Sequence, residues 1–225
     1  SVPDLRGQVT SRQEVLRGLS QGLLRSAGRV GLLGNTLEIH HGAAPLFDPV
    51  FLHSASEKFG VSLSLDKGSQ SGHGQRIRCD TTELPFQDKV FSMVVLHHVV
   101  SDGREAELAE AVRVLARDGV LIVLGLNRLG WRYLSQGKIR RLPGLAPLKV
   151  KFALDRLQMT MQGFAGAGLM GRSGPLFIHS GPAALVLPVA DVILLQARHQ
   201  DSPEVTPLRF REQRSTVVQS APMGS

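Results

Sequence analysis

The sequence predicts a single α/β domain built on a mainly parallel sheet. Two apolar runs, residues 90–96 and 120–124, enclose residues 105–116, whose apolar side chains recur at helical spacing. Strand, helix and strand in this order form the repeating unit of a parallel sheet. Both runs are continuously apolar rather than alternating, which is typical of strands that helices cover on both faces. The expected fold is therefore a three-layer α/β/α sandwich.

The composition allows one domain of ordinary to large size. Of the 225 residues, 42% are hydrophobic but only 5% are aromatic, so the core must consist mainly of leucine, valine and alanine. The single cysteine, Cys79, excludes an intramolecular disulfide and a cysteine-based zinc cluster, and we expect it to be buried rather than reactive. We find no apolar run of membrane-spanning length and no basic-then-apolar opening segment, so we expect a cytoplasmic protein by default.

The amino-terminal part contains one clear helix signal. Residues 1–10 lack periodicity and are expected to form a flexible lead. Ser11 to Glu14 form a capping-box pattern, and the helix that follows should end near Gly28. The other elements expected before residue 80 are strands over 29–33, 61–65 and 76–79 and a helix over 43–60.

The positive charge is concentrated in one segment of the carboxyl-terminal part. The formal net charge is +7, and residues 128–156 hold eight Lys and Arg against Asp155 alone, so this segment carries the whole excess (eight minus one). Such a surface suits an anionic substrate, an RNA backbone or an acidic partner protein, whereas a merely solvated basic face is the alternative. The aromatics among these charges are few, so a stacking platform for single strands is weakly supported: Trp131, Tyr133 and Phe152.

The remaining elements complete one domain. Within the basic segment we expect a helix over 148–161, and residues 190–198 should form a strong final strand. The tail, 200–225, is dominated by Pro, Ser, Gln and Arg and should be mobile. The predicted domain spans residues 11–199, with 128–162 as a basic cover region.

A series of short motifs resembles the class I S-adenosylmethionine-dependent methyltransferases, most closely the small-molecule, methyltransferase-11-like branch. The motifs are Asp80-Thr-Thr-Glu-Leu-Pro-Phe86, Phe91-Ser-Met-Val-Val95, Glu110-Ala-Val-Arg-Val-Leu115 and Asp118-Gly-Val-Leu-Ile-Val-Leu-Gly125, with Asn127 and Trp131 resembling one bacterial subgroup. The close similarity covers about residues 76 to 131. It implies a Rossmann-like methyltransferase fold, an antiparallel last strand and S-adenosylmethionine as the cofactor.

The same resemblance implies a cofactor site with a degenerate glycine motif. In the family, the first strand leads into an acidic residue and a glycine-rich turn, because glycines let the backbone approach the cofactor closely. Here residues 34–42 follow the expected first strand. They include Gly34 and Gly42 without G-x-G spacing. Gly34 is the candidate cofactor contact in this turn.

Three further candidates come from the second and third strands. By the resemblance, Asp66 would accept hydrogen bonds from the ribose hydroxyls, and Asp80 would accept one from the adenine amino group. Thr81 would supply a neighbouring backbone contact. The alternatives are a solvated turn aspartate for Asp66 and a turn cap for Asp80.

Two histidines end the strand over 90–96. Ligands of open α/β sheets bind at the carboxyl edge, so His97 could contact the cofactor or act as a base near neutral pH; a polar strand-end residue is the alternative. Adjacent strand residues point to opposite faces, so we expect neither the pair His97 and His98 nor the pair His40 and His41 to bind a metal together, and we assign no metal site.

The sequence supports three functional hypotheses. The preferred one is methyl transfer from S-adenosylmethionine to a small-molecule or RNA substrate, a reaction that depends on alignment more than on acid–base groups; we assign no catalytic residue. The altered glycine turn, and Ser92 where the family usually has aspartate, favour a catalytically inactive methyltransferase-like subunit that binds a partner protein through its basic segment or tail. An RNA-binding protein on the same fold is the third.

Overall fold

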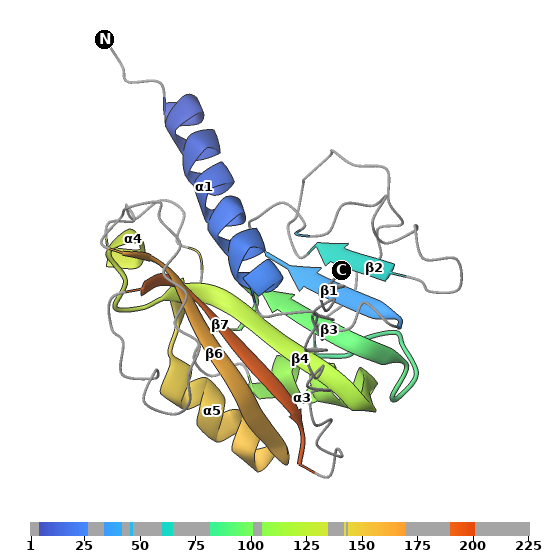
Figure 1. Ribbon diagram of the computed structural model, residues 1–225. Coiled ribbons are helices and arrows are strands. Elements are labelled where there is room, and N and C mark those ends of the chain that lie inside the picture. Colours follow the sequence, from blue (N-terminus) through green and yellow to red (C-terminus); the bar gives the residue numbers. More distant parts are fainter. Residues whose placement is uncertain are drawn as a thin grey trace, which may run out of the picture.

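The computed structural model describes residues 5–26, 34–41, 46, 60–64, 82–100, 105–134, 142, 144–169 and 190–200. In chain order the elements are α1 (Leu5–Ser26), β1 (Thr36–His40), β2 (Gly60–Ser64), β3 (Phe91–His97), α3 (Glu105–Val114), β4 (Leu115–Asn127), α4 (Trp131–Leu134), β5 (Gly144–Leu145), α5 (Pro147–Arg156), β6 (Met159–Leu169) and β7 (Ala190–His199) (Figure 1).

The strands form one mixed sheet in the order β2-β1-β3-β4-β7-β6, with the short β5 paired to the end of β4. β1 pairs in parallel with β2 and β3, and β3 pairs in parallel with β4. β7 runs antiparallel to both β4 and β6. The predicted mainly parallel sheet with an antiparallel last strand is confirmed.

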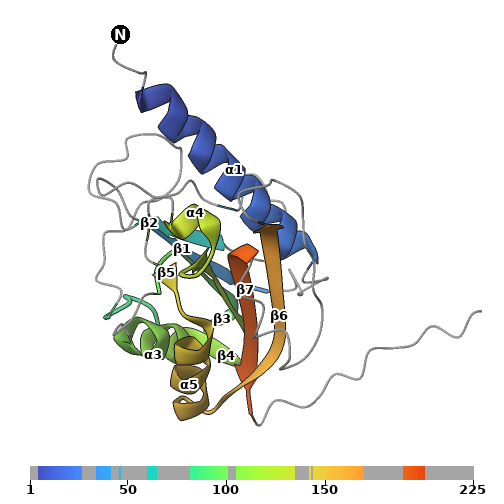
Figure 2. The same ribbon diagram turned by 90° about the vertical axis from the view of Figure 1, so that its left-hand side faces the viewer.

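Helices cover both faces of this sheet (Figures 1 and 2). On one face α1 packs through Leu16, Leu19 and Leu23 against side chains of β3, β4, β6 and β7. On the other face α3 and α5 contribute to the larger core. β3 and β4 are buried along almost their whole length. This is expected for strands that lie between two helical layers. The predicted three-layer α/β/α sandwich is confirmed.

Several element boundaries differ from the sequence prediction. α1 begins at Leu5, so residues 5–10 continue the helix instead of forming a lead. The predicted helix over 148–161 ends at Arg156, and Met159 and Met161 belong to β6. Gln158, with φ 56°, makes the left-handed turn between them. The predicted strands over 29–33 and 76–79 and the helix over 43–60 lie mainly outside the described residues, as does the tail beyond 200.

The most consequential difference concerns the first strand. β1 consists of Thr36–His40, residues that the sequence interpretation assigned to the turn after the first strand. All five β1 residues are buried. Because β1 lies between β2 and β3, its carboxyl end is flanked by strands on both sides. The residues next to the expected ligand edge are therefore His40 and His41.

Candidate functional site

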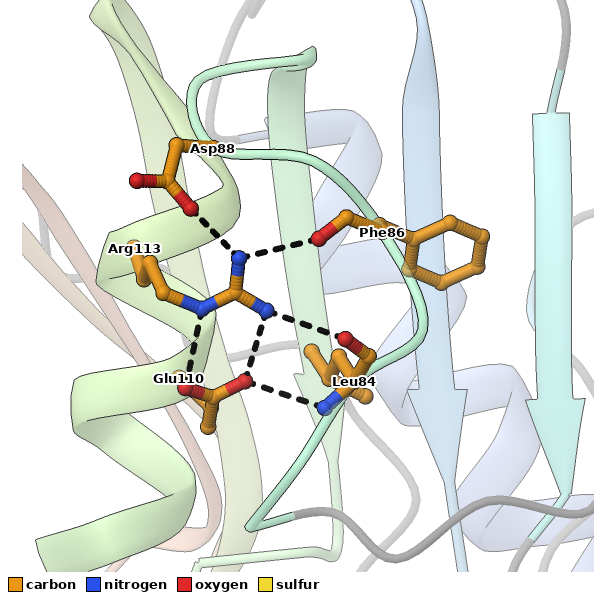
Figure 3. Close-up of polar contacts among 5 residues, drawn as sticks. All are labelled: Leu84, Phe86, Asp88, Glu110 and Arg113. Carbon is orange, nitrogen blue, oxygen red and sulfur yellow. Dashed lines mark hydrogen bonds and ion pairs between the residues drawn. The ribbon is translucent and has the colours of Figure 1, made fainter.

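The turn before β3 is held by one arginine of α3 (Figure 3). The Arg113 guanidinium donates hydrogen bonds to the carbonyl oxygens of Leu84 (3.0 Å) and Phe86 (2.9 Å). It also forms ion pairs with Asp88 (2.6 Å) and Glu110 (2.8 Å). Glu110 in turn accepts a hydrogen bond from the Leu84 amide at 2.9 Å. This network fixes the direction in which the chain enters β3.

The same network shifts the ionisation of its members. Hydrogen bonding to Arg113 lowers the pKa of Glu110, against the opposing effect of burial. Hydrogen bonds to Glu110 and Asp88 raise the pKa of Arg113. Phe86 adds an edge-to-face contact with Phe91, the first residue of β3, with ring centroids 5.0 Å apart. Glu110 and Arg113 belong to the motif on which the family resemblance rests, and their role here is to anchor the turn.

Four histidines gather at the carboxyl ends of β1 and β3: His40, His41, His97 and His98, called the histidine cluster below. His40 pairs in register with His97, so both side chains lie on the same face of the sheet. The His41 amide donates a hydrogen bond to the His97 carbonyl at 3.1 Å. Only 6% of His40, 0% of His97 and 1% of His98 is exposed.

The two adjacent histidines of β3 lie together, contrary to the prediction that they point apart. β3 ends at His97, and His98 has a φ of 57°, in the left-handed region that few non-glycine residues adopt. The strand alternation therefore does not apply to His98, and the two ring centroids are 4.4 Å apart. Among the described residues, no group of three or more His, Cys, Asp or Glu side chains is arranged to hold a metal ion.

Burial keeps His97 and His98 electrically neutral near neutral pH. Burial, followed by the charges of His98 and His40, lowers the pKa of His97 well below its usual value. Burial, followed by the charge of His41, lowers the pKa of His98 to about 4. A group that remains neutral over this range donates and accepts hydrogen bonds but does not attract an anion by charge.

Helix α1 closes the cluster from one side. The Ser20 hydroxyl lies 3.3 Å from His97 Nε2, and Ser20 is itself fully buried. Two further hydrogen bonds link the neighbouring strand β1 to Leu46, and Leu46 to α1. The Leu46 amide donates to Glu38 Oε1 at 2.6 Å, and Gln21 of α1 donates to the Leu46 carbonyl at 3.2 Å. Figure 1 shows the arrowheads of β1 and β3 ending beneath the carboxyl-terminal turns of α1.

The predicted cofactor residues are not brought together within the described residues. Gly34 precedes β1 at its amino end, whereas His97 lies at the opposite, carboxyl end of the neighbouring strand. A Cβ atom on Gly34 would lie 2.6 Å from the Ser92 Cβ, so this glycine permits a close contact between chain segments. Asp66, Asp80 and Thr81 lie outside the described residues. Their contact with a cofactor, like that of Gly34, stays a prediction.

Sequence reasoning missed Glu38, His40 and Ser20 as residues of this site. Once β1 is placed at 36–40, Glu38 is the acidic residue of the first strand, and His40 and His41 stand at its carboxyl end. The signal was present in the alternation Leu37, Glu38, Ile39, but the more apolar run before Gly34 was preferred. Ser20 could not be found from local pattern, because its contact with His97 spans 77 positions.

An open α/β sheet with parallel strands on one side and an antiparallel penultimate strand in space defines the S-adenosylmethionine-dependent methyltransferase fold. The family described as Methyltransferase domain, methyltransferase-11, matches residues 50–123. This part of the chain is thus similar to that family. No curated protein matches the sequence.

Solved methyltransferase structures share the fold at low sequence identity. The S-adenosylmethionine-dependent methyltransferase of Thermotoga maritima has a TM-score of 0.55 at 12% identity, covering 84% of this chain and 93% of that one. That of Mesorhizobium loti has a TM-score of 0.54 at 15% identity, covering 82% and 100%. The 1,6-didemethyltoxoflavin-N1-methyltransferase of Burkholderia thailandensis, solved with its substrate and S-adenosylhomocysteine, has a TM-score of 0.51 at 14% identity, covering 86% and 81%. These likenesses establish the fold alone.

The two described residues at the end of β1, His40 and His41, are not the glycines with which the family binds S-adenosylmethionine. A glycine-rich turn is needed after the first strand so that the backbone can approach the cofactor. Here the last residue of β1 is His40, a buried side chain beside the buried His97. The Ser20 hydroxyl of α1 lies 3.3 Å from the Nε2 atom of this His97 side chain. At the described ends of β1 and β3, histidine side chains of the chain itself are therefore buried side by side.

Proposed function

We propose that this chain is a methyltransferase-fold protein that acts by binding a partner and not by methyl transfer. The observation that carries the proposal is the buried His40 at the end of β1, in register with the buried His97. On this proposal, imidazole rings at these positions occupy the space that the methionine or ribose moiety of the cofactor would need. The basic segment 128–156, which carries the net charge of the chain, is the surface we propose for the partner.

One observation favours methyl transfer as a second candidate function. His97 Nδ1 and both ring nitrogens of His98 are buried in the described part of the chain and have no hydrogen-bond partner there. Such groups cost free energy that a ligand could recover by hydrogen bonding. The family match over residues 50–123 points to S-adenosylmethionine as that ligand, and the acceptor would be a small molecule or RNA.

Calorimetric titration with S-adenosylmethionine and S-adenosylhomocysteine distinguishes partner binding from methyl transfer. We expect no heat of binding and no rise in melting temperature at millimolar ligand. Micromolar binding that Asp80→Ala weakens would overturn the proposal and support the enzyme. Such binding would also be visible in thermal unfolding, since a ligand at one hundred times its Kd adds about 2.7 kcal/mol to the free energy of unfolding. Asp118→Ala is the matched control: this aspartate is exposed in the first part of β4, so its replacement should leave any binding unchanged.

A further inference from the structure

Helix α1 has 22 residues and packs on the sheet through one face. Neither α1 nor any other helix among the described residues is long and apolar enough to cross a membrane. The buried leucines of the packed face are Leu16, Leu19 and Leu23. A fully buried serine, Ser20, stands among them.

The sheet presents polar side chains to α1 at the ends of β1 and β3. Met93 and Val95 of β3 pack in the same apolar cluster as the leucines of α1, so the two-residue period of a strand places His97 on that face as well. Alternate residues of β1 pair in register with these three positions and share their face. The buried polar side chains that face α1 are therefore Thr36, Glu38, His40 and His97.

Two polar contacts join the carboxyl-terminal half of α1 to these strands. The Ser20 hydroxyl lies 3.3 Å from His97 Nε2, and the Gln21 side chain donates a hydrogen bond to the Leu46 carbonyl at 3.2 Å. Leu46 is itself held by Glu38, which accepts a hydrogen bond from its amide at 2.6 Å. Water can take the place of both helix partners when the helix moves away, so these contacts stabilise the closed position only modestly.

Two glycines weaken the helix on both sides of its contact with His97. Gly18 and Gly22 stand two positions before and two positions after Ser20, in the interior of α1. A Cβ atom at either glycine would meet no heavy atom of the described residues within 4 Å beyond its own helical turn. Close packing against the described residues therefore does not account for them. Glycine is less favourable than alanine in a helix interior, because it loses more conformational freedom on folding.

The closed arrangement also leaves buried nitrogen atoms without hydrogen bonds. His97 Nδ1 and both ring nitrogens of His98 have no partner among the described residues, and both side chains are almost completely buried. Such atoms destabilise the closed state, because each would bond to water if water could enter. Displacing Ser20 would admit water to the His97 ring from the α1 side. The closed state is thus weakened at the helix and at the histidines.

We propose that residues 20–26 of α1, called the lid below, open while the rest of the domain stays folded. Leu16 and Leu19 precede the lid and keep the earlier turns of the helix on the sheet, whereas opening exposes Leu23. Local openings occur where few apolar contacts are lost, and they cost less than global unfolding. The open lid presents His97 and the carboxyl end of β3 to a ligand. This inference goes beyond the partner binding proposed above, because it gives α1 control of access to the histidine cluster.

Hydrogen exchange followed by mass spectrometry tests whether the lid opens on its own. We expect the amides of residues 20–24 to exchange at least about tenfold faster than those of residues 121–126 in β4, which are released only when the sheet unfolds. Diethylpyrocarbonate, which modifies neutral imidazole, reports on the histidines in the same protein. His97 should react in the folded state, at a rate that follows the exchange of the lid amides.

Alanine at the two glycines should hold the lid closed. In Gly18→Ala/Gly22→Ala we expect lid exchange and His97 modification each to slow by about tenfold or more, because alanine favours the helix at both positions and has room there. Circular dichroism checks that the variant folds. Glu14→Ala is the matched control: Glu14 is exposed on the same helix before the lid, and glutamate and alanine both favour helices, so the rates should change less than about threefold.

A second variant should act in the opposite direction. Ser20→Ala removes the contact with His97, so His97 modification should become about twofold to threefold faster although alanine is the better helix former. An unchanged or slower reaction would overturn the role of Ser20 in holding the lid.

Equal exchange rates in the lid and in β4 would show that α1 leaves the sheet only on global unfolding, and would overturn the proposal. His97 modification at the same rate in wild type and in the double alanine variant would overturn it too. Neither result bears on the partner proposed above. Cofactor binding in the calorimetric titration would overturn that proposed function and leave the lid in place.

Discussion

At the scale of single residues, Arg113 of α3 holds the turn before β3 in place. Its guanidinium joins two carbonyl oxygens and two carboxylates of the turn before β3 and of α3. We expect Arg113→Ala to lower the free energy of unfolding by about 2 kcal/mol, because partly buried carbonyl groups lose their donor and Glu110 loses its counter-charge. Urea unfolding followed by circular dichroism measures this change.

Arg117→Ala is the matched control for this prediction. Arg117 is exposed, so its removal should change the free energy of unfolding by less than about 0.5 kcal/mol. Equal losses in the two variants would show that the network contributes nothing specific. The motif around Glu110 predicted the helix correctly, but it could not predict this network, because Arg113 reaches a carbonyl 29 positions away.

At the scale of elements, the close approach of the chain before β1 to the start of β3 depends on two small residues, Gly34 and Ser92. The Asn35 carbonyl accepts hydrogen bonds from the amides of Ser92 (2.9 Å) and Met93 (3.3 Å), which brings the preceding Gly34 against Ser92. A Cβ on Gly34 would lie 2.0 Å from the Ser92 Oγ and 2.6 Å from its Cβ. We expect Gly34→Ala to cost about 2 kcal/mol of stability, because the strands must separate slightly.

A double-mutant cycle tests the cause of this loss. Ser92→Gly removes both clashing atoms, so adding it to Gly34→Ala should recover about half of the lost stability or more. Chemical denaturation of the two single variants and the double variant gives the coupling. Strict additivity would mean that the glycine is needed for another reason, such as the cofactor contact predicted for it.

Contacts of β1 with distant residues explain why the position of the first strand was predicted incorrectly. Residues 29–33 are apolar and short, as strands are, whereas β1 contains Glu38 and His40, which local hydrophobicity counts against a buried strand. Long-range contacts reverse that preference, since the buried Glu38 accepts a hydrogen bond from Leu46 and His40 pairs with His97. In contrast, β3, β4 and β7 each contain an uninterrupted apolar run (93–96, 120–124 and 192–195), so the sequence alone was sufficient to place them.

At the scale of the whole molecule, the fold could be predicted because alternating strands and helices leave few topologies open. The site could not, for a different physical reason. Its character depends on side chains from α1, β1 and β3 that meet only in three dimensions, as Ser20 and His97 do. The sheet has the methyltransferase fold, whereas the described ends of β1 and β3 carry the buried side chains of His40 and His97.

The histidine cluster should make the stability of the whole molecule depend on pH in a defined window. Burial lowers the pKa of His98 from 6.5 to about 4, and the pKa of His97 is also lowered. Between these values the unfolded chain binds protons that the folded chain excludes, so stability falls as the pH drops below about 6.5 and levels off for His98 below about 4. His98 alone should contribute a loss of roughly 3 kcal/mol across that window.

Urea unfolding at a series of pH values, with wild type and His98→Asn side by side, measures this loss. Asparagine tolerates the left-handed backbone at this position and does not titrate, so the variant should show a clearly flatter pH dependence. The carboxylate Glu110 cannot imitate the effect: its pKa is lowered in the folded state, so its contribution is lost only below about pH 4.5. A pH profile of the variant that superimposes on that of wild type between pH 6.5 and 4 would show that His98 is not buried in solution as it is here. The end of β3, which lies beside the His40 side chain that carries the proposed binding role, would then be open to a ligand.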